Sequence, residues 1–190
     1  MPTIITRGAA SAKGFGFGGA TTYIKPSMTR TGAVGTITSN AAGYSLSAFD
    51  DSTFAYLATG KTAGKWYWEA TAQSNTLFGV TDDPTTARAF GGYSTQNAGL
   101  YRAGGTFWNE YGAVPSSITA PTAGDTLGFA LDVSAETLAV YVNNVLGDTL
   151  TMGTISTTVY PLFGFQGGPT SQVKLGPGLT YSPPAGFLKY

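Results

Sequence analysis

The feature that most constrains this chain is a set of short segments in which apolar and polar residues alternate. From Leu127 to Val133 every second residue is apolar, and the next segment, residues 137–142, repeats the pattern. A period of two directs one face of an extended strand toward a core and the other toward solvent. The two segments therefore predict half-buried β-strands.

Similar segments recur along the chain from residue 31 onward. Turn-forming residues such as Asp50-Asp51-Ser52 and Asn143-Asn144 separate several of them. No window has the pattern of an amphipathic helix of about ten residues or more. Many short strands predict an all-β fold, an antiparallel two-sheet sandwich of the jelly-roll kind, for residues 31–190. The further expected strands are 43–49, 54–57, 64–72, 76–81, 99–102, the stretch around 107–108, 145–147, 159–165 and 171–175.

Residues 1–30 differ from the rest of the chain. They are rich in glycine and alanine and show no sustained period of either secondary structure. This predicts a flexible N-terminal segment ahead of the sandwich. It is either a disordered leader or a peptide that becomes ordered when it docks on a partner. Phe15 and Phe17 supply apolar anchors for docking, and both interpretations remain open at this level.

Composition excludes several classes of function. Ten basic and ten acidic residues give no net charge, so the clustered Lys and Arg that nucleic-acid binding needs are missing. Without histidine or cysteine there is no Ser-His-Asp triad, disulfide or thiolate metal site. No apolar run approaches the roughly 20 residues that span a bilayer. We expect no metal, cofactor, nucleic-acid partner or membrane insertion, and assembly in the cytoplasm.

Three segments, in this order, resemble the SPRY (B30.2) family of concanavalin-A-like sandwiches. They are Gly64-Lys65-Trp66-Tyr67-Trp68-Glu69 followed by Phe78-Gly79-Val80, then residues 124–132, then residues 138–144. The run Tyr160-Pro161-Leu162-Phe163 matches a late strand of the family. The resemblance spans residues 40–176. It implies a recognition module without catalytic activity, directed mostly at protein segments.

The N-terminal stretch, residues 5–17, is similar to a segment of tailed-bacteriophage virion proteins that precedes fibre, tail or decoration modules. This resemblance implies a structural protein of a phage virion, with Arg7, Phe15 and Phe17 docking on the particle. Its partners would be other virion proteins, further copies of itself, and a glycan or protein on the host surface.

Aromatic and polar residues near strand ends are the candidate ligand-binding residues. Trp108, Asn109, Glu110 and Tyr111 combine stacking faces with polar tips, and loops on rigid sandwiches are where binding residues gather. Trp108 either contacts a ligand or caps the end of the sandwich. The proposed ligand-binding residues are Arg88, Tyr93, Tyr101, Trp108, Asn109 and Tyr111.

Trp66 and Trp68 lie on one face of their expected strand, with Tyr67 on the other. Two tryptophans on one face usually fill a core, with their indole N–H groups bonded to backbone acceptors. A platform for stacking carbohydrate is the alternative. The SPRY resemblance places this strand inside the sandwich, so we favour the core.

Acidic residues offer little support for catalysis or metal binding. A glycosidase needs two carboxylates across the scissile bond, and nothing around Glu69 and Glu110 nominates them as that pair. Asp82-Asp83-Pro84 is a turn rather than a Ca²⁺ site, because no spaced acidic set completes it. The chain is therefore expected to be a non-enzymatic virion protein. The alternatives are a free peptide- or carbohydrate-recognition domain and a glycan-degrading enzyme.

Overall fold

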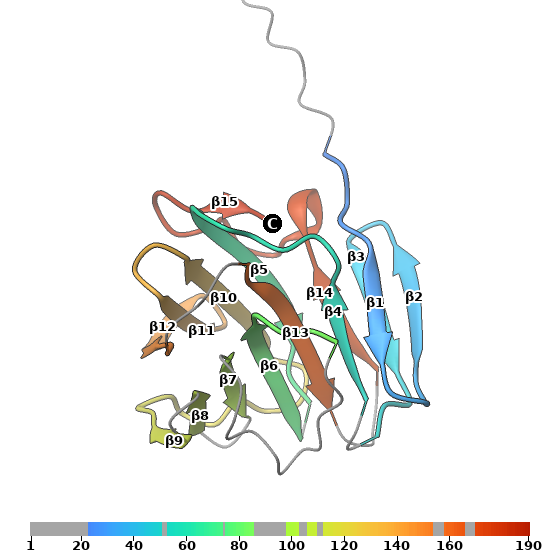
Figure 1. Ribbon diagram of the computed structural model, residues 1–190, viewed down its shortest axis with the longest axis horizontal. Helices are drawn as coiled ribbons and strands as arrows, with labels where there is room; N and C mark the ends of the chain where they lie inside the picture. The colour runs from blue at the N-terminus through green and yellow to red at the C-terminus, as the bar shows by residue number, and fades with distance from the viewer. Residues whose placement is uncertain are drawn as a thin grey trace, which may run out of the picture.

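The computed structural model describes residues 23–50, 53–73, 75–85, 98–102, 106–109, 112–153, 158–165 and 170–190. In this part of the chain two antiparallel sheets face each other and form a sandwich (Figure 1). The described residues contain no α-helix, and one short 3₁₀ turn, Gly176–Gly178, follows the last long strand. The all-β, two-sheet prediction is confirmed.

The first sheet has seven strands in the order β1-β4-β13-β6-β7-β8-β9. All neighbouring pairs in it are antiparallel. Its strands are β1 (Met28–Thr31), β4 (Phe54–Leu57), β6 (Thr76–Thr81), β7 (Ala98–Arg102), β8 (Thr106–Asn109), β9 (Gly112–Pro115) and β13 (Tyr160–Phe165).

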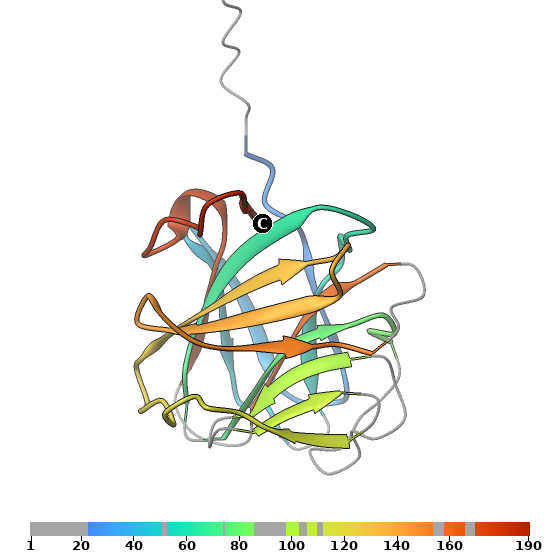
Figure 2. The same ribbon diagram turned by 90° about the vertical axis from the view of Figure 1, so that its left-hand side faces the viewer.

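The second sheet follows the order β12-β11-β10-β5-β14-β3-β2, and β15 adds to β5 as a short parallel strand. In Figure 2 the amber and orange strands β10, β11 and β12 run side by side across this sheet. Its strands are β2 (Thr36–Asn40), β3 (Gly43–Ser47), β5 (Lys65–Thr71), β10 (Thr126–Asp132), β11 (Thr137–Val142), β12 (Val145–Thr151), β14 (Ser171–Lys174) and β15 (Leu188–Lys189).

The β11–β12 hairpin forms where the turn chemistry predicts it. Asn143 and Asn144 have φ values of 48° and 70°, the left-handed conformation that asparagine tolerates and that a tight hairpin turn needs. The Asn143 side chain also accepts a hydrogen bond from the Thr126 backbone N–H, at 3.0 Å. Turn and alternation together set the register of this half of the sheet.

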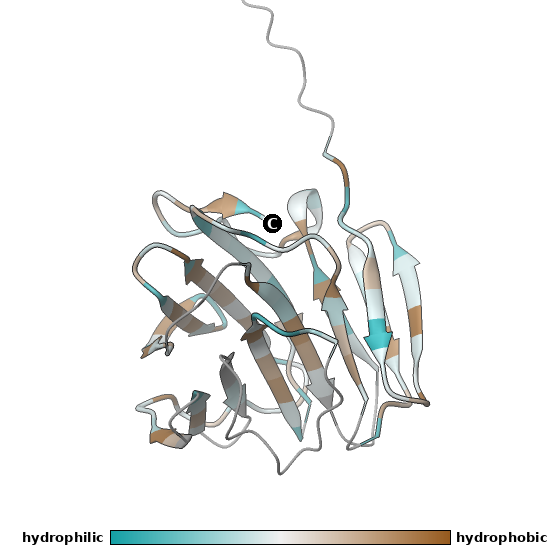
Figure 3. Ribbon diagram, viewed as in Figure 1, coloured by the Kyte–Doolittle hydropathy of each residue, from teal (hydrophilic) through white to brown (hydrophobic). Residues whose placement is uncertain are grey.

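Aromatic rings join the two sheets through the middle of the core. Trp68 of β5 stacks on Phe129 of β10 at 5.6 Å between ring centroids. Phe129 meets Phe78 of β6 across the sandwich, and Phe78 meets Phe163 of β13. Bands of hydrophobic and less hydrophobic colour alternate along strands such as β6 and β13 (Figure 3). Alternation therefore directs one side of each sheet into a shared core.

Four strands were not expected from the sequence: β15, which pairs with β5, and the three sheet-edge strands β1, β2 and β9. β1 begins at Met28, so the predicted boundary near residue 30 falls inside a strand paired with β4. β2 has only Ile37 as a large apolar residue, and β9 is a four-residue strand ending at Pro115. β1 and β2 contain no fully buried residue, so they have little apolar alternation to reveal them.

Candidate functional site

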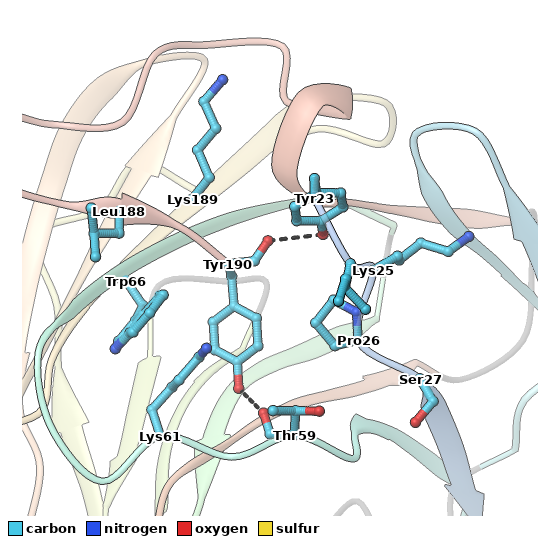
Figure 4. A pocket seen from close by; sticks show the side chains of 11 residues that line it. Tyr23, Lys25, Pro26, Ser27, Thr59, Lys61, Trp66, Leu188, Lys189 and Tyr190 are labelled. Atoms are coloured by element: carbon cyan, nitrogen blue, oxygen red, sulfur yellow. Dashed lines mark hydrogen bonds between the residues drawn. The ribbon is translucent and has the colours of Figure 1, made fainter. Parts of the chain in front are cut away.

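A pocket of about 940 Å³ opens at the end of the sandwich where the chain enters β1 (Figure 4). Its walls come from four places: the extended segment before β1, the turn between β4 and β5, the start of β5, and the last three residues. The lining residues are Tyr23, Ile24, Lys25, Pro26, Ser27, Thr59, Lys61, Trp66, Leu188, Lys189 and Tyr190.

Tyr190 forms the inner wall of the pocket. Its ring packs against Trp66 and Trp68, at 5.9 and 5.7 Å between ring centroids. The hydroxyl donates to the Thr59 carbonyl, and the backbone oxygen accepts a hydrogen bond from the Tyr23 hydroxyl at 3.0 Å. Burial raises the pKa of Tyr190 far above its usual value. The ring is therefore a fixed, uncharged surface that closes the core beneath the pocket.

Trp66 lies beside Tyr190 but remains partly exposed. Its indole N–H donates to the carbonyl of Ala63 at 2.8 Å, which fixes the ring at the end of β5. One face of the ring carries the ammonium group of Lys61, 3.5 Å from the ring centroid. Trp66 thus links the aromatic core to the open pocket.

Lys61 holds its ammonium group between two aromatic rings. Its backbone pairs with Val159 through two hydrogen bonds, of 2.8 and 2.9 Å, which fix where the side chain starts. Nζ lies 3.5 Å from the Trp66 centroid and 4.5 Å from that of Tyr190, within cation–π range. Burial lowers the pKa of Lys61. In the part of the chain that the structure describes, Nζ has neither a carboxylate nor a hydrogen-bond acceptor.

The other two lysines of the lining are arranged differently. Nζ of Lys25 donates to the carbonyls of Asn40 and Gly43, at 2.9 and 3.1 Å, and so is bound to the β2–β3 turn. Lys189 is exposed, and its side chain extends away from the two rings (Figure 4). Lys61 is therefore the lysine whose charge faces the aromatic wall.

Glu69, on the opposite face of β5 from the two tryptophans, anchors the C-terminal segment that supplies Tyr190. Its carboxylate is fully buried and accepts backbone N–H bonds from Thr180 and Tyr181, at 2.7 and 2.8 Å. The Tyr67 hydroxyl donates a third bond at 3.3 Å. These contacts assign Glu69 a structural role, since its oxygens are occupied by the chain itself.

The two tryptophans of β5 have different surroundings. Trp68 is fully buried in the core, as the sequence favoured. Trp66 instead lines the pocket. The expected backbone acceptor exists for Trp66, but the Trp68 indole N–H has no partner among the described residues. That part of the prediction is wrong for Trp68, because the aromatic rings around it offer no acceptor.

Three of the predicted ligand-binding residues lie away from the pocket. Tyr101 is fully buried beside Phe107 in the core, and burial raises its pKa to about 12. Asn109 is buried, and its amide donates to the Thr151 carbonyl of β12 at 3.3 Å. Trp108 is partly buried and packs against a small cluster of Phe54, Leu77 and Leu162. This cluster is separate from the main hydrophobic core.

The remaining predicted residues lie outside the part of the chain that the structure describes. They are Arg88, Tyr93 and Tyr111 of the proposed ligand site and Arg7, Phe15 and Phe17 of the proposed docking segment.

Sequence reasoning missed Lys61, Tyr23 and Tyr190. The five-residue spacing of Lys61 and Trp66 across a glycine-containing turn is a weak signal for a cation beside an aromatic ring. The two tyrosines lie far apart in sequence and near the ends of the sandwich domain, and no local pattern connects them. Only pairing of the C-terminal segment with β5 brings them together.

No group of carboxylates able to hold a metal ion occurs among the described residues. Asp83 instead closes a turn, since its carboxylate accepts the backbone N–H of Thr85 at 3.3 Å and its own N–H donates to the Thr81 hydroxyl. Within the same residues, no helix has the length and apolar character needed to cross a bilayer.

Comparison with known proteins identifies the architecture. No protein-family model matches the chain, and no curated protein sequence is similar to it. The SPRY domain of human HERC1 matches with a TM-score of 0.57 and 20% identity, over 68% of this chain and 87% of that one. Stonustoxin matches with a TM-score of 0.54 and 19% identity, over 73% of this chain and 24% of its own. The chain therefore has a SPRY-like β-sandwich fold, as the motifs of β5, β10 and β11 predicted.

Proposed function

We propose that this chain is a non-enzymatic recognition and assembly protein of a tailed-phage virion. Its N-terminal segment attaches to the particle, and its sandwich binds a neighbouring subunit or the host surface. The observation that carries the binding role is the pocket around Trp66, Tyr190 and Lys61. It is concave and largely apolar, and hydrogen bonds fix its inner wall at Tyr190 and Trp66, which is the usual character of a ligand site.

The position of the pocket also suits an assembly role. Tyr23 and Ile24 line it, and they directly follow residues 1–22, the stretch that carries the phage-like motif. A partner bound here is held next to the point where the chain attaches to the particle. A module fixed in this way can organise neighbouring copies, and repeated copies on a particle follow its symmetry.

The SPRY-like fold supports recognition rather than catalysis. SPRY domains act as binding modules, and the buried carboxylate of Glu69 is committed to backbone N–H groups. The low charge of the chain and its lack of cysteine suit a particle that is assembled in the host cytoplasm and then released. We place the protein on the virion, as a tail, fibre or capsid-surface component.

Particle incorporation tests this proposal. The phage that encodes the chain is complemented with tagged full-length protein, with a variant lacking residues 2–22, or with the variant Phe15→Ala/Phe17→Ala. The deletion stops before Tyr23, so the pocket and β1 remain intact. We expect full-length protein in purified particles, loss of the deletion variant, and at least a tenfold reduction for the double substitution.

Thermal unfolding of each purified variant is the control, and it should match that of the full chain. Full-length protein that is abundant in the lysate but absent from particles contradicts the virion role. Deletion variants that are incorporated normally contradict the docking role of the N-terminal segment.

A further inference from the structure

The pocket lining is rich in lysine. Its lining contains Lys25, Lys61 and Lys189 and, within the described residues, neither aspartate nor glutamate. Lys25 is bound to backbone carbonyls and Lys189 extends into solvent. Lys61 is half-buried, and its ammonium group lies over the rings of Trp66 and Tyr190.

Partial burial of an unpaired ammonium group costs free energy, because water is removed and no anion replaces it. Cation–π attraction to the two rings offsets part of this free-energy cost. The lowered pKa of Lys61 has the same origin, since burial disfavours the charged form. A carboxylate arriving at Nζ would complete the pair in a partly desolvated place, where charge-assisted hydrogen bonds are strong.

Aliphatic side chains border the same cavity. Ile24 is 83% exposed and Leu188 is 60% exposed, and they belong to segments on different sides of the pocket. Their exposed side chains are available for apolar contact with a ligand in the pocket. Apolar groups of a ligand, next to its carboxylate, can contact these two residues.

The arrangement favours a peptide over a sugar. Carbohydrate recognition by Trp66 requires a free ring face, and the Lys61 ammonium group lies 3.5 Å over one face of that ring. The ring of Tyr190 packs against it at an interplanar angle of 65°. A peptide needs no stacking face, because its carboxylate can meet Nζ while its apolar side chains contact the aliphatic residues.

We propose that the pocket binds a segment of a partner protein in which an aspartate or glutamate is flanked by apolar residues. Lys61 receives the carboxylate, and Ile24 and Leu188 contact the flanking side chains. The inference rests on the proposed role of the pocket in recognition, and it names the partner chemistry of that site. It does not depend on where in the particle, or outside it, the partner is found.

Binding to peptides of defined sequence tests the inference with the purified full chain. The probes are an array of hexapeptides with one Glu or Asp among Leu, Ile and Phe, and a matched array with Gln or Asn in its place. Affinities of the strongest binders are then measured by fluorescence anisotropy. We expect the acidic peptides to bind at least tenfold more tightly than their amide counterparts, with affinity falling as salt rises.

Variants locate the interaction. Lys61→Met keeps the length of the side chain and removes its charge, so it should abolish the preference for acidic peptides, and Lys61→Arg should retain most of it. Lys174→Met, outside the pocket, is the matched control and should leave the affinity within about twofold. Thermal unfolding verifies that each variant is folded, which we expect because Lys61 pairs with Val159 through its backbone.

Three outcomes would overturn the inference: no peptide in either array binds, acidic and amide peptides bind equally, or the acidic preference survives Lys61→Met. Oligogalacturonate, an acidic sugar, is tested in parallel. If it binds in a Lys61-dependent way and the peptides do not, the pocket is a glycan site and the peptide proposal fails. The assay needs no particle, so failure of the virion role and failure of this inference are distinguished.

Discussion

Tryptophan has different surroundings in the middle of the sandwich and at its open end, the end that carries the pocket. Trp68 and Trp66 are two residues apart on the same face of β5. Trp68 is fully buried and packs against the rings of Phe129 and Tyr190. Trp66 is partly exposed, and it contacts Tyr190, the Lys61 ammonium group and the pocket. A side chain on the core face of a strand is therefore buried only if it also lies far enough from the end of the sheets.

The difference should appear most strongly in stability. Trp68→Ala removes a fully buried ring and leaves a cavity, so we expect a loss of about 3–5 kcal/mol in the free energy of unfolding. Trp66→Ala removes a partly exposed ring and should cost only about 1–2 kcal/mol. Urea unfolding followed by far-UV circular dichroism measures both. Equal losses would show that the pocket end is as enclosed as the centre.

A smaller loss of stability is expected when the hydrogen bonds between Glu69 and the C-terminal segment are weakened. Glu69→Gln places an amide N–H₂ group among three hydrogen-bond donors, so at least one of them loses its acceptor. We expect a loss of about 2–3 kcal/mol. Tyr67→Phe removes one donor only and should cost about 1 kcal/mol.

Hydrogen exchange shows which part of the chain loses stability. In the Glu69→Gln variant the amides of residues 176–190 should exchange faster, because the C-terminal segment is released from β5. Protection in β10 should change much less. Uniformly faster exchange in both places would mean that the open end and the centre unfold as one unit.

The smallest expected effect concerns the ion pair beside Trp66. Lys65 and Asp132 are paired at 2.8 Å across β5 and β10. The hydrogen bond from Lys65 is the main cause that lowers the pKa of Asp132 below its usual value. Half of the Lys65 side chain is exposed, so Asp132→Asn should cost only about 0.5 kcal/mol at neutral pH.

The sign of the pH dependence follows from the lowered pKa. The unfolded chain takes up the proton at a higher pH than the folded chain, so the contribution is complete above about pH 4–5 and is lost as pH falls through the folded pKa. The stability difference between wild type and Asp132→Asn should therefore shrink in acid. A difference that stays constant from pH 7 to pH 2 would contradict the pairing. High salt at pH 7 should also reduce it.

The strands of the sandwich could be predicted because their information is local. Residues 125–142 alternate with a period of two and meet at a turn, so β10 and β11 and their inward faces follow from neighbours in sequence. The same reasoning failed at the edges, where β2 and β9 have little apolar surface to alternate. The burial of Tyr101 could not be predicted either, because a tyrosine near a strand end gives the same sequence signal whether its ring points inward or outward.

The pocket could not be predicted, because its residues share no local pattern. Lys61, Trp66 and Tyr190 come together only when the C-terminal segment pairs with β5 and Tyr190 enters the space between the sheets. Alternating side chains are a property of consecutive residues, so the strand content and the all-β character could be read from the chain directly. A site built from segments more than a hundred residues apart depends on strand order and on where each sheet ends, and these arise from packing of the whole domain.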